Sequence, residues 1–209
     1  MAKINNGHFG SFQGKIGAVT GVKRRGKFYI RQSIVTNKSN TKAQAMIRAQ
    51  FKNVCMTLAP FAPLINIGFK NSTEPGMTAY NAGIGFNFDK VDALSHTLAA
   101  KDIVIARGSL LNVANPILAT AGGTNIKVNW TDNSDEMMGA TADDFVYVAI
   151  MEETSKRVIM AHGLRKDASI DIKAPTEFVG HILHAYIFTA TEMGNKCSDS
   201  IYCGTATLE

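Results

Sequence analysis

Metal binding is the chemistry that spacing reveals most directly, and His181 and His184 are the two histidines closest together. The stretch around them alternates in hydrophobicity and predicts a strand. Residues three apart on a strand point to opposite faces, whereas ligands that share a face need a spacing of two. The other histidines are isolated: His8, His96 and His162. We therefore expect no metal site.

The thiols Cys55, Cys197 and Cys203 are an odd and sparse set. This argues against a disulfide scaffold and fits a reducing compartment. Cys197 and Cys203 lack the Cys-x-x-Cys spacing of redox motifs. We expect ordinary buried thiols or neighbours on a hairpin.

Adjacent carboxylates occur twice, at Asp143–Asp144 and at Glu152–Glu153. Both pairs stand at the ends of predicted strands, which favours solvated turns over a pair of acid–base catalysts. The chain also lacks the Gly-x-Ser-x-Gly motif that presents a nucleophilic serine. We expect no catalytic residues, no cofactor and no enzymatic activity.

A glycine-rich segment occupies residues 5–21, with glycines every three or four positions. A phosphate-binding loop would need a preceding strand and a Gly-Lys-Ser/Thr ending, and neither is present. Tight turns and close backbone approach are the more general uses of glycine. The segment is therefore predicted to be an arm of short strands that takes part in assembly. Its candidate residues are Asn6, Gly7, Gly10, Gly14, Lys15, Gly17 and Gly21.

Charge is distributed unequally along the chain. Residues 1–73 contain twelve Lys or Arg and no Asp or Glu, whereas the remainder holds ten basic and seventeen acidic residues. Such asymmetry points to a nucleic acid or an acidic partner, which includes the acidic part of another copy. The cluster Lys23–Lys27 has only Phe28 and Tyr29 beside it, which is little for stacking on bases. Possible contacts to phosphates or to an acidic partner are Lys15, Lys23, Arg24, Arg25, Lys27, Arg31, Lys38, Arg48 and Lys52.

An amphipathic helix is predicted over Lys42–Leu58. Thr41 and Gln44 have the spacing of a capping box. Apolar residues then recur every three or four positions and form one stripe. Pro60 and Pro63 should end the helix and leave a short second turn before Gly68. The stripe is predicted to be core or a helical interface: Ile47, Phe51, Val54 and Leu58.

The composition fits a folded protein. The 209 residues are 45% hydrophobic and 19% charged, which excludes disordered and collagen-like chains. No apolar run approaches the roughly 18–20 residues that span a bilayer, and the first residues lack the apolar core of a signal peptide. We therefore expect no membrane partner, synthesis in the cytoplasm and, for a particle component, a final place in the virion.

The remaining pattern is mainly of strands. Lys27–Val35 is predicted to be a strand, Met77–Phe88 a short helix or an extended segment, and Ile103–Ile105 a strand that enters a turn. Short strands about ten residues apart follow Pro116 and predict an antiparallel sandwich. We place the domain boundary so that residues 1–112 form the glycine-rich arm, strand and helix, and residues 113–209 form the sandwich.

The second part resembles a fibronectin type III or immunoglobulin-like module. Asn125–Trp130 is similar to the second strand of that fold, which carries a buried tryptophan, and His184–Gly194 is similar to its tyrosine-bearing penultimate strand. Residues 115–124 would supply the first strand. Such modules are usually binding scaffolds, so the resemblance implies a non-enzymatic role.

The first part resembles an uncharacterised family, a domain of unknown function, of Bacteroidota and their phages. The resemblance implies a glycine-rich start, a helix and a sandwich, and brings no activity with it. The proline-rich basic stretch usual before the helix is here replaced by Thr36–Asn40. The matching motifs are Asn6-Gly7, Gly14-Lys15-x-Gly17, Ile30-Arg31, Thr41-x-Ala-Gln44-x-x-x-Arg48-x-x-Phe51, Ile65–Lys70, Met77–Asn81 and Arg107–Leu110.

Together these observations predict a β-rich α+β protein with an N-terminal assembly region and a C-terminal sandwich. We expect a structural protein that forms a homo-oligomer or binds other virion proteins, as a component of a phage virion or tail-type particle. Its arm would pair with the exposed strand edge of a neighbour. The alternative is a protein that binds nucleic acid without sequence preference. A lesser alternative is a surface- or carbohydrate-binding adhesin, which would need an exposed aromatic platform.

Overall fold

The computed structural model describes residues 3–4, 11–24, 26–33, 40–74, 76–92, 95–120, 122–135 and 139–208. The chain divides into two compact units, residues 1–45 and 46–209. The second unit contains both helices and sandwich, and the boundary expected at residue 112 falls where its chain passes from the helical part to the first sandwich strand.

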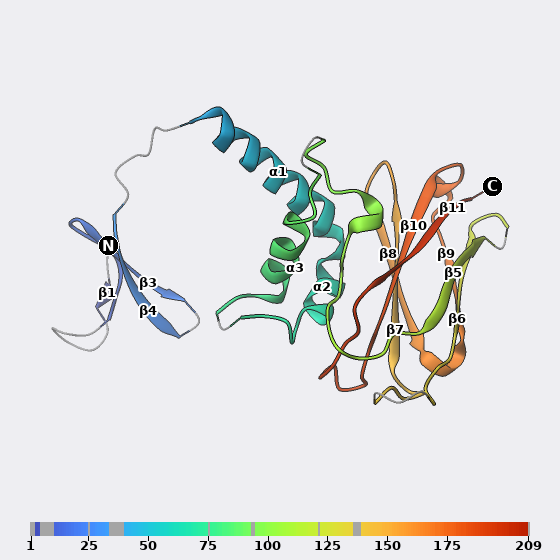
Figure 1. The fold of residues 1–209 in the computed structure, drawn as a ribbon. Helices are drawn as coiled ribbons and strands as arrows, with labels where there is room; N and C mark the ends of the chain where they lie inside the picture. Colours follow the sequence, from blue (N-terminus) through green and yellow to red (C-terminus); the bar gives the residue numbers. More distant parts are fainter. Residues whose placement is uncertain are drawn as a thin grey trace. The chain divides into compact units, whose positions relative to one another are not determined.

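The first unit is a small antiparallel sheet with the order β1-β2-β3-β4 (Figure 1). Short glycine turns join its later strands: Gly17 has a φ of +54° and Gly26 a φ of +79°, values that favour glycine. The strand predicted from Lys27 forms as far as Gln32, and residues 34–39 lie outside the described residues. The strands are β1 (Lys3–Ile4), β2 (Phe12–Ile16), β3 (Val19–Arg24) and β4 (Lys27–Gln32).

The predicted helix forms as α1 (Lys42–Leu58). Its capping box is present, because the Thr41 hydroxyl accepts the Gln44 N–H at 3.2 Å and the Gln44 side chain accepts the Thr41 N–H at 3.3 Å. A 3₁₀ turn and α2 (Ala62–Gly68) follow, and α3 (Ala79–Phe88) settles the ambiguous segment as a helix. None of the described helices is long and apolar enough to cross a membrane.

The prediction of a strand at Ile103–Ile105 is wrong. The segment is extended, but its backbone N–H groups donate to side chains and not to the carbonyl groups of a neighbouring strand. The Val104 N–H donates to the Asn87 side chain at 2.8 Å, and the Ile105 N–H donates to the Ser200 hydroxyl at 3.0 Å. An apolar β-branched run therefore satisfies its backbone without joining a sheet.

The prediction of an antiparallel sandwich is confirmed. One sheet has the order β5-β6-β9 and the other the order β11-β10-β7-β8. Trp130 is buried near the end of β6, and Tyr186 is buried on β10, as the resemblance implied. The strands are β5 (Ala114–Thr120), β6 (Asn125–Thr131), β7 (Phe145–Glu152), β8 (Val158–Leu164), β9 (Ser169–Lys173), β10 (Ile182–Ala190) and β11 (Ile201–Thr207).

The second unit has a third layer, formed by the helices (Figure 1). Side chains of β7 and β10 alternate between two cores. Val148 and Ile187 point into the sandwich, whereas Ala149 and Phe188 pack with helix residues such as Leu58. Both faces of these strands are therefore buried, which explains why β7 is a nearly continuous apolar run rather than an alternating one.

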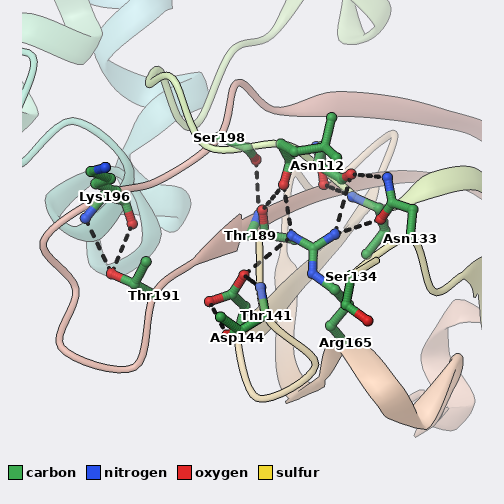
Figure 2. A network of polar contacts seen from close by, with 12 residues as sticks. Asn112, Asn133, Ser134, Thr141, Asp144, Arg165, Thr189, Thr191, Lys196 and Ser198 are labelled. Atoms are coloured by element: carbon green, nitrogen blue, oxygen red, sulfur yellow. Dashed lines mark hydrogen bonds and ion pairs between the residues drawn. The ribbon is translucent and has the colours of Figure 1, made fainter. Parts of the chain in front are cut away.

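A buried arginine joins several segments of the second unit (Figure 2). The Arg165 side chain is fully buried, and its guanidinium donates to the Asn133 side chain at 2.6 Å and the Leu111 carbonyl at 2.7 Å. It also contacts the Asn112 carbonyl at 3.3 Å and the Asp144 carboxylate at 3.4 Å. The network therefore holds the chain that leads from the helices to β5 against the end of the sandwich.

The expectation that Asp144 lies in a solvated turn is wrong. Its side chain is 2% exposed, since it faces Arg165 and accepts bonds from the Thr141 N–H at 2.8 Å and hydroxyl at 2.9 Å. A buried carboxylate needs such partners because desolvation penalises its charge. Its neighbour Asp143 is exposed and pairs with Lys166 at 2.8 Å.

We predict that Arg165→Leu lowers the free energy of unfolding by about 3–5 kcal/mol, because it leaves Asp144 buried without its cation. Urea unfolding followed by the fluorescence of Trp130 measures the loss. Arg157→Leu is the matched control, since Arg157 forms an exposed pair with Glu177 whose removal should cost about 1 kcal/mol or less. Equal losses in the two variants would contradict the assignment.

Candidate interaction surfaces

The glycine-rich arm lies in the first unit. Asn6, Gly7 and Gly10 lie outside the described residues. Gly14 and Lys15 lie on β2, Gly17 in the turn and Gly21 on β3. The described part of the arm pairs with strands of its own chain, because β2 lies between β1 and β3. Among the described strands, the outer ones are β1 and β4, whereas β2 and β3, which carry these glycines, lie inside the sheet.

Gly21 allows β3 to lie close to Phe12 of β2. A Cβ at this position would lie 2.2 Å from the Phe12 carbonyl oxygen and 2.7 Å from the Phe12 ring. Any side chain would therefore displace β2, and Phe12 lies over β3 on this face. Glycine acts here by close backbone approach, as the sequence indicated.

One face of the sheet is apolar. Residues paired directly across an antiparallel sheet share a face. Gly21 pairs with Ile30, and Lys23 with Phe28. Only Gly21 is buried among the described residues from 11 to 33, and Ile30 is 68% exposed. We call this the apolar face; it carries Phe12, Ile16, Val19, Phe28 and Ile30.

The opposite face is basic. Thr20 pairs with both Lys15 and Arg31, and Arg24 pairs with Lys27. The aromatic ring on this face is that of Tyr29, which is 53% exposed. We call this the basic face; it carries Lys15, Thr20, Val22, Arg24, Lys27, Tyr29 and Arg31.

The stripe predicted on α1 divides into two parts. Val54 and Leu58 are fully buried in the core, whereas Ile47 is 56% and Phe51 50% exposed. Phe51 forms one wall of a groove of about 470 Å³ between α1 and α3, and its ring centroid lies 6.2 Å from that of Phe88. We call this the α1–α3 groove; it is lined by Phe51, Asn81, Ile84, Gly85, Phe88 and Asp89.

The candidate cations do not form a single cluster. Lys23 lies on the apolar face, with its ammonium 5.1 Å from the centre of the Phe28 ring. Arg48 and Lys52 lie on α1, outside the first unit. Arg25 and Lys38 lie outside the described residues. The structure gathers the other four on the basic face: Lys15, Arg24, Lys27 and Arg31.

The apolar face and the α3 wall of the groove are not among the sites predicted from the sequence. A signal for the first was present, because Phe28 and Ile30 alternate with Tyr29 and Arg31 along β4. Separating the two sides of the strand would have revealed one apolar and one cationic surface. The groove depends on how two helices pack, and periodicity within one helix does not give this.

The expectation of a solvated turn is also wrong for Glu152. Its side chain is 1% exposed and ends β7 in the turn to β8. Burial raises the pKa of Glu152, but bonds from the Ser155 hydroxyl and from the N–H groups of Thr154 and Ser155 outweigh burial and lower it to about 2. This carboxylate is a turn cap that remains charged, which is poorly suited to proton transfer near neutral pH.

His181 and His184 have separate partners. The His181 Nδ1 atom lies 3.2 Å from Glu152, whereas the His184 Nδ1 atom lies 2.8 Å from the Tyr202 hydroxyl. Burial lowers the pKa of His184, although nearby Glu153 opposes this. Within the described chain, no three His, Cys, Asp or Glu side chains lie together as metal ligands would.

The cysteines Cys55, Cys197 and Cys203 are free thiols. Cys197 is buried and donates to the Gly68 carbonyl at 3.0 Å. Burial raises the pKa of Cys197, and it raises the pKa of Cys203 to about 12. A thiol with a raised pKa is a poor nucleophile, so these groups serve packing.

Comparison with protein families assigns the chain to a family. Residues 11–204 match the model described as "Family of unknown function (DUF6266)". The chain belongs to this family. The match includes β2, the helices and the sandwich, so family membership covers both units. The range of organisms implied by the resemblance stays a prediction. No curated protein matches the chain.

Solved structures similar to this family member are fibronectin type III modules. The fn3 domain of human collagen alpha-1(XX) chain is 8% identical with a TM-score of 0.38, and the match covers 48% of this chain and 86% of that one. The FN5 domain of Drosophila Lar is 10% identical with a TM-score of 0.33, and the match covers 46% of this chain and 98% of that one.

We predict that acid destabilises the second unit through Glu152. Its folded-state pKa of about 2 lies below the ordinary value of 4.5, so its contribution is complete above about pH 4.5 and is lost as the pH falls towards 2. Urea unfolding between about pH 6 and about pH 2.5 should show a steeper loss for the natural chain than for Glu152→Gln. Glu177→Gln, which changes an exposed carboxylate, is the control and should leave the steep loss in place.

Proposed function

We propose that this protein is a non-enzymatic structural component that assembles with copies of itself through the apolar face of its N-terminal sheet. The exposure of that face supports the proposal. Four of its large side chains are more than a third exposed: Ile16, Val19, Phe28 and Ile30. A contiguous apolar surface on a soluble protein commonly marks an interface.

The sheet is too small to bury this face by itself. Its strands have two to six residues, and Gly21 contributes no side chain to a core. Small sheets need a layer packed against their apolar side for independent stability. Among the described strands, β4 also has no neighbour on its outer side, since it ends the strand order, and such an edge can add a strand from another chain.

The α1–α3 groove of a second copy is the occupant that we propose for the apolar face. The groove presents the half-exposed Phe51 beside Ile84 and Phe88. Asp89 at the groove is complementary in charge to Lys23 on the apolar face. Contact between two different surfaces is heterologous, so it propagates into rings or filaments. A phage virion or tail-type particle is the setting that we expect, on the resemblance to a family with phage members.

The interior of the second unit supports a non-enzymatic role. The buried Asp144, Arg165 and Glu152 bond to backbone and neighbouring side chains, so each serves a structural purpose. An adhesin would need an exposed aromatic platform, and the tryptophan does not provide one. Trp130, the single tryptophan, is 5% exposed and donates its indole N–H to the Arg165 carbonyl at 2.8 Å.

We predict that Ile30→Ser lowers the association constant by about 10- to 150-fold, the equivalent of exposing one large apolar side chain. Size-exclusion chromatography with light scattering measures the mass across a concentration series. Tyr29→Ser is the matched control, because it removes a neighbouring side chain from the basic face and should leave the mass unchanged. Circular dichroism and Trp130 fluorescence should show an intact second unit in both variants.

Mixing variants tests the heterologous contact. Phe51→Ser alone should also lose the assembly. Ile47→Ser is the control, because Ile47 is exposed on α1 but does not line the groove, and it should leave the assembly in place. An equal mixture of Ile30→Ser and Phe51→Ser should give a dimer, since it combines one intact apolar face with one intact groove. A Phe51→Ser protein that still assembles fully would disprove the groove as the occupant. A natural chain that stays monomeric at all concentrations would overturn self-assembly.

A further inference from the structure

The basic face carries cations that have no carboxylate partners. Lys15, Arg24, Lys27 and Arg31 form no ion pair with any residue that the structure describes. The first acid of the sequence is Glu74, so none of residues 1–73 can neutralise them. The basic face therefore carries positive charge that no carboxylate of the first unit balances.

The strand register places like charges opposite one another. Arg24 and Lys27 pair directly across the β3–β4 turn. Farther from the turn on the same face, Thr20 pairs with Lys15 on one side and with Arg31 on the other. Like charges directly opposite on a sheet are destabilising. Such an arrangement gains stability from an anion that bridges the cations.

Tyr29 gives the face a second property. Its ring is 53% exposed, and its paired neighbour is Val22. It lies on β4 between Lys27 and Arg31, about 7 Å from each along the strand. An exposed aromatic ring flanked by cations on a sheet suits a single-stranded nucleic acid, because bases stack on the ring while phosphates meet the cations.

We infer that the basic face binds single-stranded nucleic acid without sequence preference. Lys15, Arg24, Lys27 and Arg31 contact phosphates, and Tyr29 stacks on a base. This role goes beyond assembly, because assembly uses the other face of the same sheet. An acidic protein surface would satisfy the cations equally well but would make no use of the exposed ring.

Fluorescence anisotropy with a labelled oligo-dT of about 20 nucleotides tests the inference on the full chain. Four phosphate contacts predict a slope of about −2.8 for the logarithm of the association constant against the logarithm of salt concentration. The affinity should therefore fall by about 50-fold between about 50 and about 200 mM salt. An absence of binding at about 50 mM salt, or an affinity that ignores salt, would overturn the inference.

Adjacent residues provide the matched pair of variants. Arg24→Glu changes the basic face and should weaken binding and reduce the slope to about −2. Lys23→Glu makes a similar change of charge on the apolar face and should have a much smaller effect. Equal effects would show that net charge alone attracts the oligonucleotide, which would overturn the assignment to a face.

Tyr29→Ala separates nucleic acid from an acidic protein. Loss of stacking should weaken oligo-dT binding by about 5-fold or more. Poly-L-glutamate is the competing probe, and binding to it as tight as to oligo-dT and unchanged by Tyr29→Ala would overturn the inference. Tighter binding to a duplex of the same length would also overturn it.

Ile30→Ser distinguishes this inference from the proposed assembly. The variant removes an apolar-face side chain and should keep the salt slope of the natural chain. Loss of assembly with retained binding supports both roles. Binding that disappears together with assembly would show that the basic face alone does not hold the oligonucleotide.

Discussion

The contact between Arg165 and its carbonyl and side-chain partners is the interaction on which the second unit depends. It joins Leu111 and Asn112, at the end of the helical part, to Asp144 near the start of β7. The Thr189 hydroxyl on β10 donates to the same Leu111 carbonyl at 3.0 Å. A guanidinium can hold these segments together because its donors have a fixed planar geometry. The network consequently ties the helical part of the second unit to its sandwich.

The first unit follows the opposite principle. The described residues from 11 to 33 include no buried side chain, and the unit has no acid to balance its cations. We propose that partners supply the hydrophobic burial and the ion pairing that such surfaces usually have. This contrast is our reason for proposing that the N-terminal sheet, and not the second unit, carries the surfaces that bind partners.

The sequence predicted the elements that depend on local rules. The helix Lys42–Leu58 and its Thr41 cap follow from periodicity and from one side-chain hydrogen bond. The burial of Asp144 and Glu152 is not predictable in this way, because the sequence of two adjacent carboxylates does not show which of them points inward. Each buried carboxylate is matched by donors that become neighbours only through the fold or a tight turn. Ile103–Ile105 was misassigned for a related reason, since Asn87 and Ser200 are distant in sequence.

For the candidate site, the sequence predicted the cations but not their separation into faces. The count of charges in residues 1–73 is independent of structure, whereas the face of each cation depends on strand register. A shift of one residue in β4 would exchange Tyr29 and Arg31 with Phe28 and Ile30. Gly26, with a φ of +79°, lies in the short turn that joins β3 to β4 in this register.

The two proposed roles are physically coupled. Assembly through the apolar face would bring the basic segments of several copies together, and their repulsion would oppose association. An anionic polymer that spans several basic faces would remove that repulsion and would bind more tightly to the assembly than to one copy. By linkage, the polymer then favours assembly to the same extent that assembly favours the polymer. If both proposed roles hold, a sheet with an apolar side and a cationic side would make association of the protein depend on the presence of the anionic polymer.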